Sequence, residues 1–436
     1  MRRSGRWRTE AWIRDELTRC VRCGNCMAVC PVYELLREEG AVARGKIALV
    51  EALAAGDLED DRHARHFLTA CLLCGRCKSA CPNEVDTPAL VQYARARLAR
   101  RSWLKRWSLG RLLPAQRLLP RLLRAARAIR LLWARRIPGS SGLHIRFSRG
   151  ADGQRRRIPP LVRPFFLDRD HPPPKGEGPE VAFFVGCVHN YMRPESAQAA
   201  IDALSALGAR VHVPAGQACC GLPAWGAGES EGARKLARRN LEALAPAGEM
   251  PDFVTSVCAS CAYMLRFHMH ELLEAEPGLA ERARMLMSRV LPFSMLWSRL
   301  AGLDREGAGR QRNGSLLTYH DPCHLSRAFG EKAAPRFLLT RLRDRRFVEM
   351  SHPCRCCGHG GVFNLAHFEL SAAMARDKAR RVRESGASVV VTECSGCLLQ
   401  LSEALAQAVP AVEVWTTAEA LARCGVEEAD LGQGED

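Results

Sequence analysis

The spacing of the cysteines is the feature that most constrains this chain. Its 436 residues contain 20 cysteines, and 18 of them fall into dense groups with repeated intervals. The basic N-terminal stretch 1–8 is not followed by the apolar segment of a secretory signal peptide, which predicts a cytoplasmic location. Cysteine groups in a reducing compartment are more typical of metal ligands or redox centres than of structural disulfides. We therefore expect the cysteines to carry the function.

Two groups near the N-terminus share one spacing. They are Cys20-x2-Cys23-x2-Cys26-x3-Cys30-Pro31 and Cys71-x2-Cys74-x2-Cys77-x3-Cys81-Pro82. In two-cluster ferredoxins with this run, three thiolates hold one 4Fe-4S cube and the fourth reaches the other cube. The predicted ligand sets are Cys20, Cys23, Cys26 with Cys81, and Cys71, Cys74, Cys77 with Cys30. A zinc site is the alternative, but structural zinc needs only four ligands and pairs its cysteines over longer gaps.

The segment between the two groups predicts a helical module. The stretch 47–53 has helical character, so residues 1–94 are expected to form a mostly helical two-cluster domain and not the compact ferredoxin β-fold. The prolines are expected to stop each loop from continuing as helix. Residues Cys20 to Pro82, including Arg44-Gly45-Lys46-Ile47, resemble the N-terminal ferredoxin region of glycolate oxidase iron-sulfur subunits and related succinate-dehydrogenase-like modules.

Residues 95–178 are expected to form a connector. Residues 95–157 contain 19 Lys and Arg against one acid, while the whole chain has a net charge of +17, so the basicity belongs to this segment. Leucines and tryptophans are interleaved with the arginines, which predicts basic amphipathic helices broken near Pro114 and Pro120. The stretch 158–178 is rich in proline and glycine and is expected to be a linker.

Several roles are open for this connector. It could pack its apolar face on its own domain, lie on an anionic membrane surface, or dock an acidic partner. No nucleic-acid recognition motif accompanies the basic residues, so we expect no nucleic-acid partner.

The remaining half of the chain contains an internal duplication. One pattern of five cysteines occurs twice at an offset of 136 or 137 residues. The two copies are Cys187, Cys219, Cys220, Cys258, Cys261 and Cys323, Cys356, Cys357, Cys394, Cys397. We expect a first domain over residues 179–310 and a second over residues 311–436.

The hydrophobic pattern of each copy alternates strand and helix. Predicted strands cover 181–185, 210–213 and 252–257 in the first copy, and 316–319, 347–350 and 388–392 in the second, with a helix over 196–207. This pattern indicates parallel α/β sheets, whose ligands collect beyond the carboxyl ends of the strands. Each cysteine group follows a strand, so the groups should converge in space. A disulfide between adjacent cysteines is an alternative that leaves the other three cysteines of each copy unexplained.

From residue 181 onward the chain resembles the duplicated CCG domain of heterodisulfide reductase and its relatives, which include subunits for glycolate oxidation, lactate utilisation and anaerobic glycerol-3-phosphate oxidation. The resemblance implies up to two further 4Fe-4S clusters, and in heterodisulfide reductase five cysteines hold a noncubane cluster. Glycolate-type subunits often lack a cysteine of the final pair. Here both pairs are complete, as in the disulfide-reducing branch.

The residues outside the cysteine motifs are weaker candidates for a functional role. Cys354 and Cys424 complete the count of 20 cysteines. Cys354 is expected to be a free buried thiol, and a spare metal ligand is the alternative. Four histidines flank the second cysteine set and could donate hydrogen bonds to cluster sulfur or relay protons, although an ordinary structural role is the simpler interpretation; they are His320, His324, His352 and His359. Asp321 is no stronger a candidate for a catalytic role than these histidines.

The sequence has no G-x-G-x-x-G and no P-loop, so it indicates neither flavin nor nicotinamide binding. A chain with only one-electron centres needs an FAD-containing dehydrogenase partner to oxidise a hydride donor. Our main hypothesis is an electron-transfer subunit for glycolate or lactate oxidation that delivers electrons to a quinone or membrane carrier at the inner face of the cell membrane. The alternative is a catalytic subunit that reduces a disulfide.

Overall fold

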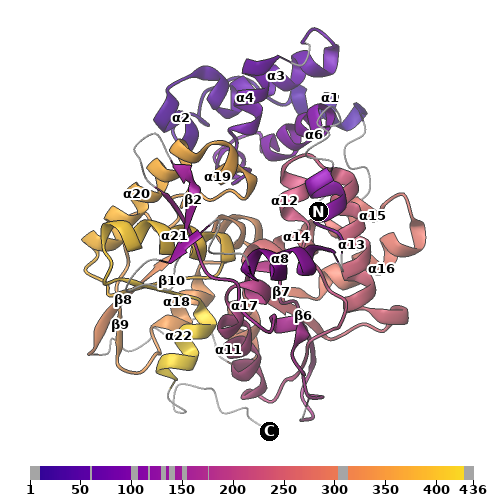
Figure 1. Ribbon diagram of the computed structural model, residues 1–436. Coiled ribbons are helices and arrows are strands. Elements are labelled where there is room, and N and C mark those ends of the chain that lie inside the picture. The colour runs from indigo at the N-terminus through magenta and orange to yellow at the C-terminus, as the bar shows by residue number, and fades with distance from the viewer. Residues whose placement is uncertain are drawn as a thin grey trace.

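The computed structural model describes residues 10–58, 61–99, 107–115, 118–128, 134–136, 143–149, 155–174, 176–302 and 313–426. These residues form a helical module, a connector with a small sheet, and two α/β units with four strands each. The helical module lies across one end of the molecule, above both α/β units (Figure 1). This arrangement confirms the predicted fold class, an α+β chain with a helical module followed by duplicated parallel-sheet domains. Among the described residues, no helix has the length and apolar character to cross a membrane.

Helices α1, α3, α4 and α6 of the helical module pack around a small core that includes Ile13, Ile47, Leu68 and Leu90, while Val32 of α2 packs in a cluster with Phe363 of the second α/β unit. Its helices are α1 (Glu10–Thr18), α2 (Pro31–Leu36), the 3-10 turn η1 (Glu39–Ala41), α3 (Ala43–Ala55), α4 (Arg62–Thr69), α5 (Arg76–Ser79) and α6 (Thr87–Ala99). The predicted helical stretch 47–53 lies in α3. Pro31 does not prevent a helix but begins α2, because the first turn needs no N–H donor from this residue.

The connector contains both helix and strand. A π-helical turn η2 (Ser108–Leu112) is followed by α8 (Leu118–Ala128). The helical structure ends at Leu112, near Pro114 as predicted, and resumes at Leu118. Pro120 lies in the first turn of α8, where a proline is tolerated, so the interruption precedes this residue. An antiparallel sheet, which the sequence did not indicate, follows with β1 (Ala134–Arg136), β2 (Leu143–Arg149) and β3 (Arg155–Ile158). The stretch after it contains η3 (Phe166–Asp168) and otherwise has no helix or strand in its described residues.

The two α/β units share one sheet topology. The first sheet has the order β5-β4-β6-β7 and the second has the equivalent order β9-β8-β10-β11, with every pair parallel. The strands are β4 (Glu180–Phe183), β5 (Arg210–His212), β6 (Phe253–Ser256), β7 (Val290–Pro292), β8 (Ser315–His320), β9 (Arg345–Phe347), β10 (Val389–Thr392) and β11 (Glu413–Trp415). The predicted strands match all of these except β7 and β11, and β9 begins and ends earlier than expected.

Helices cover both sheets. In the first unit they are α10 (Cys187–Tyr191), α11 (Pro194–Ser205), α12 (Leu222–Gly226), α13 (Ser230–Leu244), η4 (Pro246–Gly248), α14 (Ala259–Phe267), α15 (Met269–Leu273), α16 (Pro277–Ser288) and α17 (Phe293–Leu300). In the second unit they are the π-helical η5 (His324–Phe329), α18 (Ala333–Leu339), α19 (Val362–Ala366), α20 (Phe368–Glu384), α21 (Ser395–Ala408) and α22 (Thr417–Cys424).

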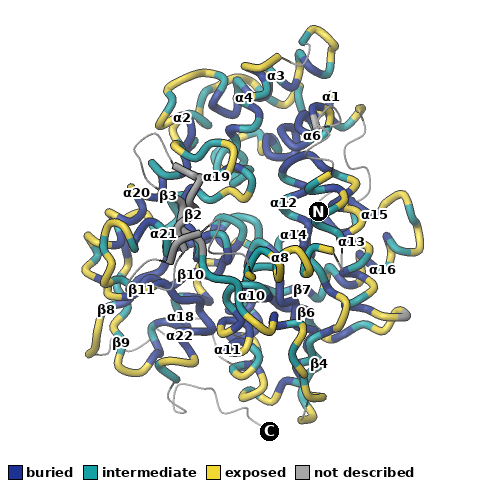
Figure 2. Tube along the Cα trace, viewed as in Figure 1, coloured by how far each residue is buried: buried dark blue, intermediate teal, exposed yellow. Residues whose placement is uncertain are grey.

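The two α/β units share a hydrophobic core. Phe183 of β4 lies in the same buried cluster as Leu317 and Tyr319 of β8. Across this contact, Glu419 of α22 accepts hydrogen bonds from Arg193 at 2.7 Å and from Ser196 at 3.0 Å. Figure 2 shows buried segments running through the interior of both units, with exposed segments at the periphery. The predicted boundary between residues 310 and 311 lies outside the described residues.

Candidate iron-sulfur centres

Four cysteines line one small cavity of the helical module, with a volume of about 30 Å³. They are Cys30, Cys71, Cys74 and Cys77, which we call the inner ferredoxin site. Cys30 comes from the first cysteine group and the other three from the second. The structure therefore brings together the crossed ligand set that the spacing predicts.

The two cysteine loops have the same backbone shape. Arg22 and Gly24 have φ values of 55° and 88°, and Leu73 and Gly75 have φ values of 52° and 75°. These residues occupy the same positions relative to Cys20 and Cys71. Left-handed backbone at two positions turns each loop back on itself, so its cysteines can face a common centre. Non-glycine residues rarely adopt this conformation, and its repetition at Arg22 and Leu73 indicates a shared requirement.

The other predicted set, Cys20, Cys23, Cys26 and Cys81, forms what we call the outer ferredoxin site. Arg19 donates a hydrogen bond to the carbonyl of Asn83 at 2.7 Å, and the Asn83 amide donates one to the carbonyl of Arg19 at 2.7 Å. These two bonds hold the loop that begins at Cys20 against the chain that follows Cys81. Cys23 is exposed, so this site is open to solvent on one side.

Two buried cations support the helical module, and the sequence pattern did not identify them. Lys46 is 2% exposed, lines the inner ferredoxin site and donates a hydrogen bond to the carbonyl of Ala41. Burial lowers the pKa of Lys46, while the nearby Cys71 and Cys30 thiolates oppose that shift. Arg95 donates hydrogen bonds to the carbonyls of Leu68 and Gly226, at 2.9 and 2.7 Å. It thereby joins the module to the first α/β unit.

All ten cysteines of the duplicated pattern line one cavity of about 240 Å³, which we call the CCG cavity. None of the ten is exposed. They come from the loops that follow β4, β6, β8 and β10 and from the two Cys-Cys-Gly turns. The predicted convergence is therefore observed, and the two copies face one space instead of two separate ones. A mostly apolar cavity lined by ten thiols has the donor set that iron-sulfur clusters use, so these residues fit the groups that the resemblance implies.

The two copies meet through sulfur and serine. The Cys258 sulfur lies 2.9 Å from Ser395 Oγ, and the Cys394 sulfur lies 3.1 Å from Ser260 Oγ. Each of these cysteines opens the Cys-x2-Cys pair of its own copy, and each contacts a serine inside the pair of the other copy. The serines were not predicted, although their position within the motifs could have indicated them.

Hydrogen bonds between thiols and burial shift the pKa values of these cysteines in both directions; hydrogen bonds from Cys258 and Cys397, for example, lower the pKa of Cys394 well below its usual range. Desolvation raises the pKa of Cys323 to about 12. A hydrogen bond with Cys219, together with burial, raises the pKa of Cys187 well above its usual range. Such thiols keep their protons at neutral pH until a metal cation replaces them, so metal binding here releases protons.

The inner ferredoxin site adjoins the CCG cavity. Cys74 lines both cavities, and its neighbours Leu72 and Leu73 also line the CCG cavity. His367 of the second unit contacts Thr69 of the module through Nε2 and Oγ1 at 3.0 Å. The structure thus places the predicted metal sites next to one another.

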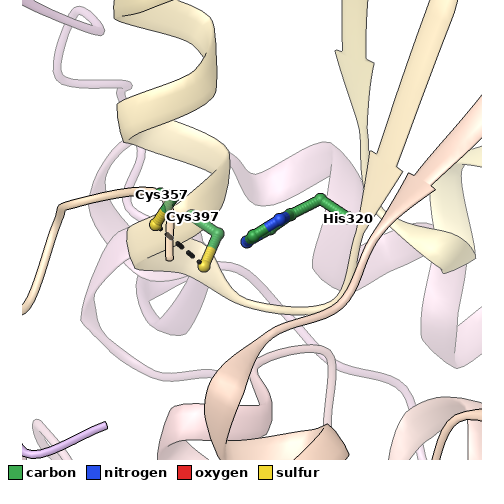
Figure 3. A group of neighbouring side chains, drawn as sticks. All are labelled: His320, Cys357 and Cys397. Atoms are coloured by element: carbon green, nitrogen blue, oxygen red, sulfur yellow. Dashed lines mark hydrogen bonds between the residues drawn. The ribbon is translucent and has the colours of Figure 1, made fainter. Parts of the chain in front are cut away.

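The four histidines that flank the second cysteine set differ in whether they line the CCG cavity. His324 and His359 line the CCG cavity, and His324 stacks on Tyr263 with ring centroids 4.2 Å apart. His320 points toward Cys357 and Cys397 (Figure 3). His352 and Cys354 are absent from the described lining of the cavity, and Cys424 packs at the shared core. Asp321 is paired with Arg336 at 2.9 Å, which accounts for its burial.

Fold and site together define an iron-sulfur protein with a helical dicluster module and two cysteine-rich domains. Residues 16–85 match the family described as 4Fe-4S dicluster domain, and residues 181–266 and 317–402 both match the CCG family, described as Cysteine-rich domain.

Individual relatives extend this match over most of the chain. A Bacillus subtilis protein named "Probable glycolate oxidase iron-sulfur subunit" is 30% identical over 405 residues, which cover 88% of each chain. Lactate utilization protein A of Bacillus licheniformis is 29% identical over 242 residues, 56% of this chain and 98% of that protein. One subunit of the fumarate reductase (CoM/CoB) of Methanothermobacter marburgensis is 25% identical over 395 residues, 89% of this chain and 68% of that protein.

The chain therefore belongs to the family of iron-sulfur oxidoreductase subunits that includes this glycolate oxidase iron-sulfur subunit. The same family features are shared with heterodisulfide-reductase-like relatives such as the fumarate reductase subunit.

Proposed function

We propose that this chain is the electron-transfer subunit of a cytoplasmic complex that oxidises a 2-hydroxy acid such as glycolate or lactate. An FAD-containing dehydrogenase subunit supplies the electrons, and a quinone or membrane carrier receives them. Iron-sulfur clusters exchange single electrons when bound. The role of this chain is to hold them with cysteines of the two ferredoxin sites and the CCG cavity. The names of the relatives from the two Bacillus species support this substrate class.

The observation that carries the proposal is the shared position of Cys74. Because Cys74 lines both the inner ferredoxin site and the CCG cavity, electrons need not cross a wide gap between them. The outer ferredoxin site, where Cys23 is exposed, offers a surface at which a partner subunit can approach. The cysteine sites therefore form a series from the surface to the interior.

The test is anaerobic purification of the tagged full chain from its own cells, followed by addition of glycolate or lactate. We expect an FAD-containing protein to co-purify and the hydroxy acid to bleach the iron-sulfur absorbance. A Cys30→Ala variant should lose much of this bleaching because it removes a predicted ligand of the inner site, whereas Cys424→Ala should behave as the parent. Absence of both the flavoprotein and the bleaching would reject the proposal.

A further cavity of about 190 Å³, separate from the inner ferredoxin site and the CCG cavity, supports an acceptor at the membrane. Its lining includes Leu119 and Pro120 of the connector together with Cys187 and Cys219. A compact ligand in this cavity, such as a quinone ring, would lie next to cysteines of the first CCG copy. Trp107, Leu118 and Leu122 of the same connector are exposed and offer apolar contacts to a lipid surface.

Disulfide reduction is the second candidate, and the shared CCG cavity favours it. Both five-cysteine sets face one space, and that space is large enough for a small disulfide. The reaction takes two electrons and two protons, breaks one S–S bond and yields two thiols. Anaerobic assay of Cys258→Ser and Cys394→Ser with a small organic disulfide tests it, because unchanged reduction in both variants would exclude catalysis in this cavity.

A further inference from the structure

His320 is a buried imidazole aimed at two cysteines of the second CCG copy. It ends strand β8 and is 1% exposed. Its ligand nitrogen and the sulfurs of Cys357 and Cys397 all lie within 4.8 Å of one another, and the two sulfurs are 3.3 Å apart. Figure 3 shows the ring directed at the sulfur pair. Three donor atoms so close together can share one metal ion.

The polar contact of the ring among the described residues is with a cysteine of the second copy. The imidazole hydrogen-bonds with Cys357, and among the described residues its Nδ1 has no hydrogen-bond partner. No described carbonyl or carboxylate therefore holds the ring in place by a hydrogen bond.

The first CCG copy provides an internal comparison. At the offset of 136 residues, Phe184 occupies the place of His320. Phe184 is fully buried in the same cluster as Cys220 and Cys261, the counterparts of Cys357 and Cys397. A phenyl ring cannot bind a metal ion through a lone pair. The two copies thus present the same cysteines but differ at the place of this potential ligand.

We propose that His320 is an iron ligand of the group held by the second CCG copy, so that sulfur and nitrogen bind this centre while the first copy binds iron through sulfur alone. The proposal rests on the proposed function only in that the CCG cysteines hold iron. Neutral imidazole carries no negative charge, and iron-sulfur centres with histidine ligands have higher reduction potentials than all-cysteine ones. The second centre should therefore take up electrons more readily than a centre bound by cysteine alone.

This asymmetry agrees with the position of the second copy relative to the helical module. The thiolate of Cys74 lies close enough to Cys323 and Cys356 for its charge to act on them. Both are cysteines of the second copy. The site nearest the inner ferredoxin site is thus the one with the nitrogen ligand, which favours transfer from the module into the CCG cavity.

The test is pulsed EPR of the full chain, purified anaerobically with and without ¹⁵N-histidine. We expect the strong nitrogen coupling of a directly bound imidazole, altered by the isotope and lost in His320→Phe. Phe184 shows that the fold accepts a phenyl ring at this place, and His320→Asn serves as a second variant if His320→Phe does not fold. Phe184→Leu in the first copy is the matched control, because it keeps an apolar side chain there, and it should keep the coupling.

Potentiometric titration gives a second measurement. We expect one centre to shift to lower potential in His320→Phe and all potentials to stay in place in Phe184→Leu. Iron and sulfide analysis separates the two proposals, since four filled centres contain about 16 irons and the ferredoxin sites alone about 8. A fully loaded chain with no directly bound nitrogen, or with unchanged coupling in His320→Phe, overturns the role of His320 alone. A chain loaded only at the ferredoxin sites overturns that role and the proposed function of the CCG cavity together.

Discussion

Arg327 donates a hydrogen bond from Nε to the carbonyl oxygen of Cys74 at 2.8 Å, across 253 positions of sequence. The bond joins the η5 turn of the second α/β unit to the inner ferredoxin site. The guanidinium is also close enough to the Cys74, Cys323 and Cys356 thiolates for their charges to act on it. Arg327 therefore places a cation at the boundary between the helical module and the CCG cavity, as Arg95 does from the side of the module.

Replacement of Arg327 by leucine should lower the reduction potential of the inner ferredoxin site. A positive charge beside thiolate ligands stabilises the added electron, and its stabilising effect is strong in a partly buried position. We expect Arg327→Lys to retain part of the effect, because it keeps the charge but not the planar fork. EPR-monitored potentiometric titration measures the shift. Arg336→Leu is the control, since Arg336 pairs with Asp321 and Glu349, and an equal shift in both variants would contradict the prediction.

Lys46 should contribute to the stability of the helical module. Its ammonium group is buried and donates a hydrogen bond to the carbonyl of Ala41. Removing a charged donor of this kind costs about 1.5–3 kcal/mol. Lys46→Met should therefore lower the free energy of unfolding by that amount, measured by anaerobic denaturation of the loaded chain. The exposed Lys332 provides the control, and a loss of the same size in Lys332→Met would argue against a specific role for Lys46.

The sequence was sufficient to predict the cysteine sites in outline because their spacing repeats. The crossed set with Cys30 and the convergence of the ten CCG cysteines both follow from local motifs and strand order. The residues between motifs were harder to predict. Arg327 and Lys46 act through contacts that only the folded chain makes. Strands β7 and β11 are as short as the predicted β5 and β9, but no cysteine group follows them to mark where they end. Sequence alone also could not show that the two copies face a single cavity.

Acidification should weaken the contact between the helical module and the second α/β unit. Burial, together with the positive charges of His66, Arg95 and Lys46, lowers the pKa of His367 from 6.5 to about 4. The unfolded chain therefore binds more protons than the folded chain between pH 4 and 6.5, so stability falls as pH decreases through this window. Anaerobic thermal unfolding at pH 7 and at pH 5 measures the effect.

The matched variant for this measurement is His367→Gln, which keeps a polar group near Thr69 but cannot be protonated in this range. We expect the difference in melting temperature between pH 7 and pH 5 to be smaller in His367→Gln than in the parent. The prediction is wrong if both proteins lose the same stability on acidification.

The connector should bind anionic membranes through the exposed side of α8. Leu118 and Leu122 are 49% and 44% exposed and lie one helical turn apart, with Arg121 between them. A helix of this kind inserts its apolar side chains at the lipid surface while its arginines meet anionic headgroups. We expect the full chain to sediment with vesicles that contain anionic lipid and to bind less at higher salt.

Replacement of both leucines by serine should weaken this vesicle binding about tenfold or more, because each leucine loses over 1 kcal/mol of apolar transfer free energy. Met285→Ser is the control, since Met285 of α16 is 46% exposed but lies outside the basic connector. Salt sensitivity should persist in the double variant, because the arginines remain. If the double variant binds anionic vesicles as the parent does, α8 does not insert into the lipid surface. Retention of an acidic protein partner by the parent but not by the double variant, without vesicle binding by either, would instead assign this surface to protein docking.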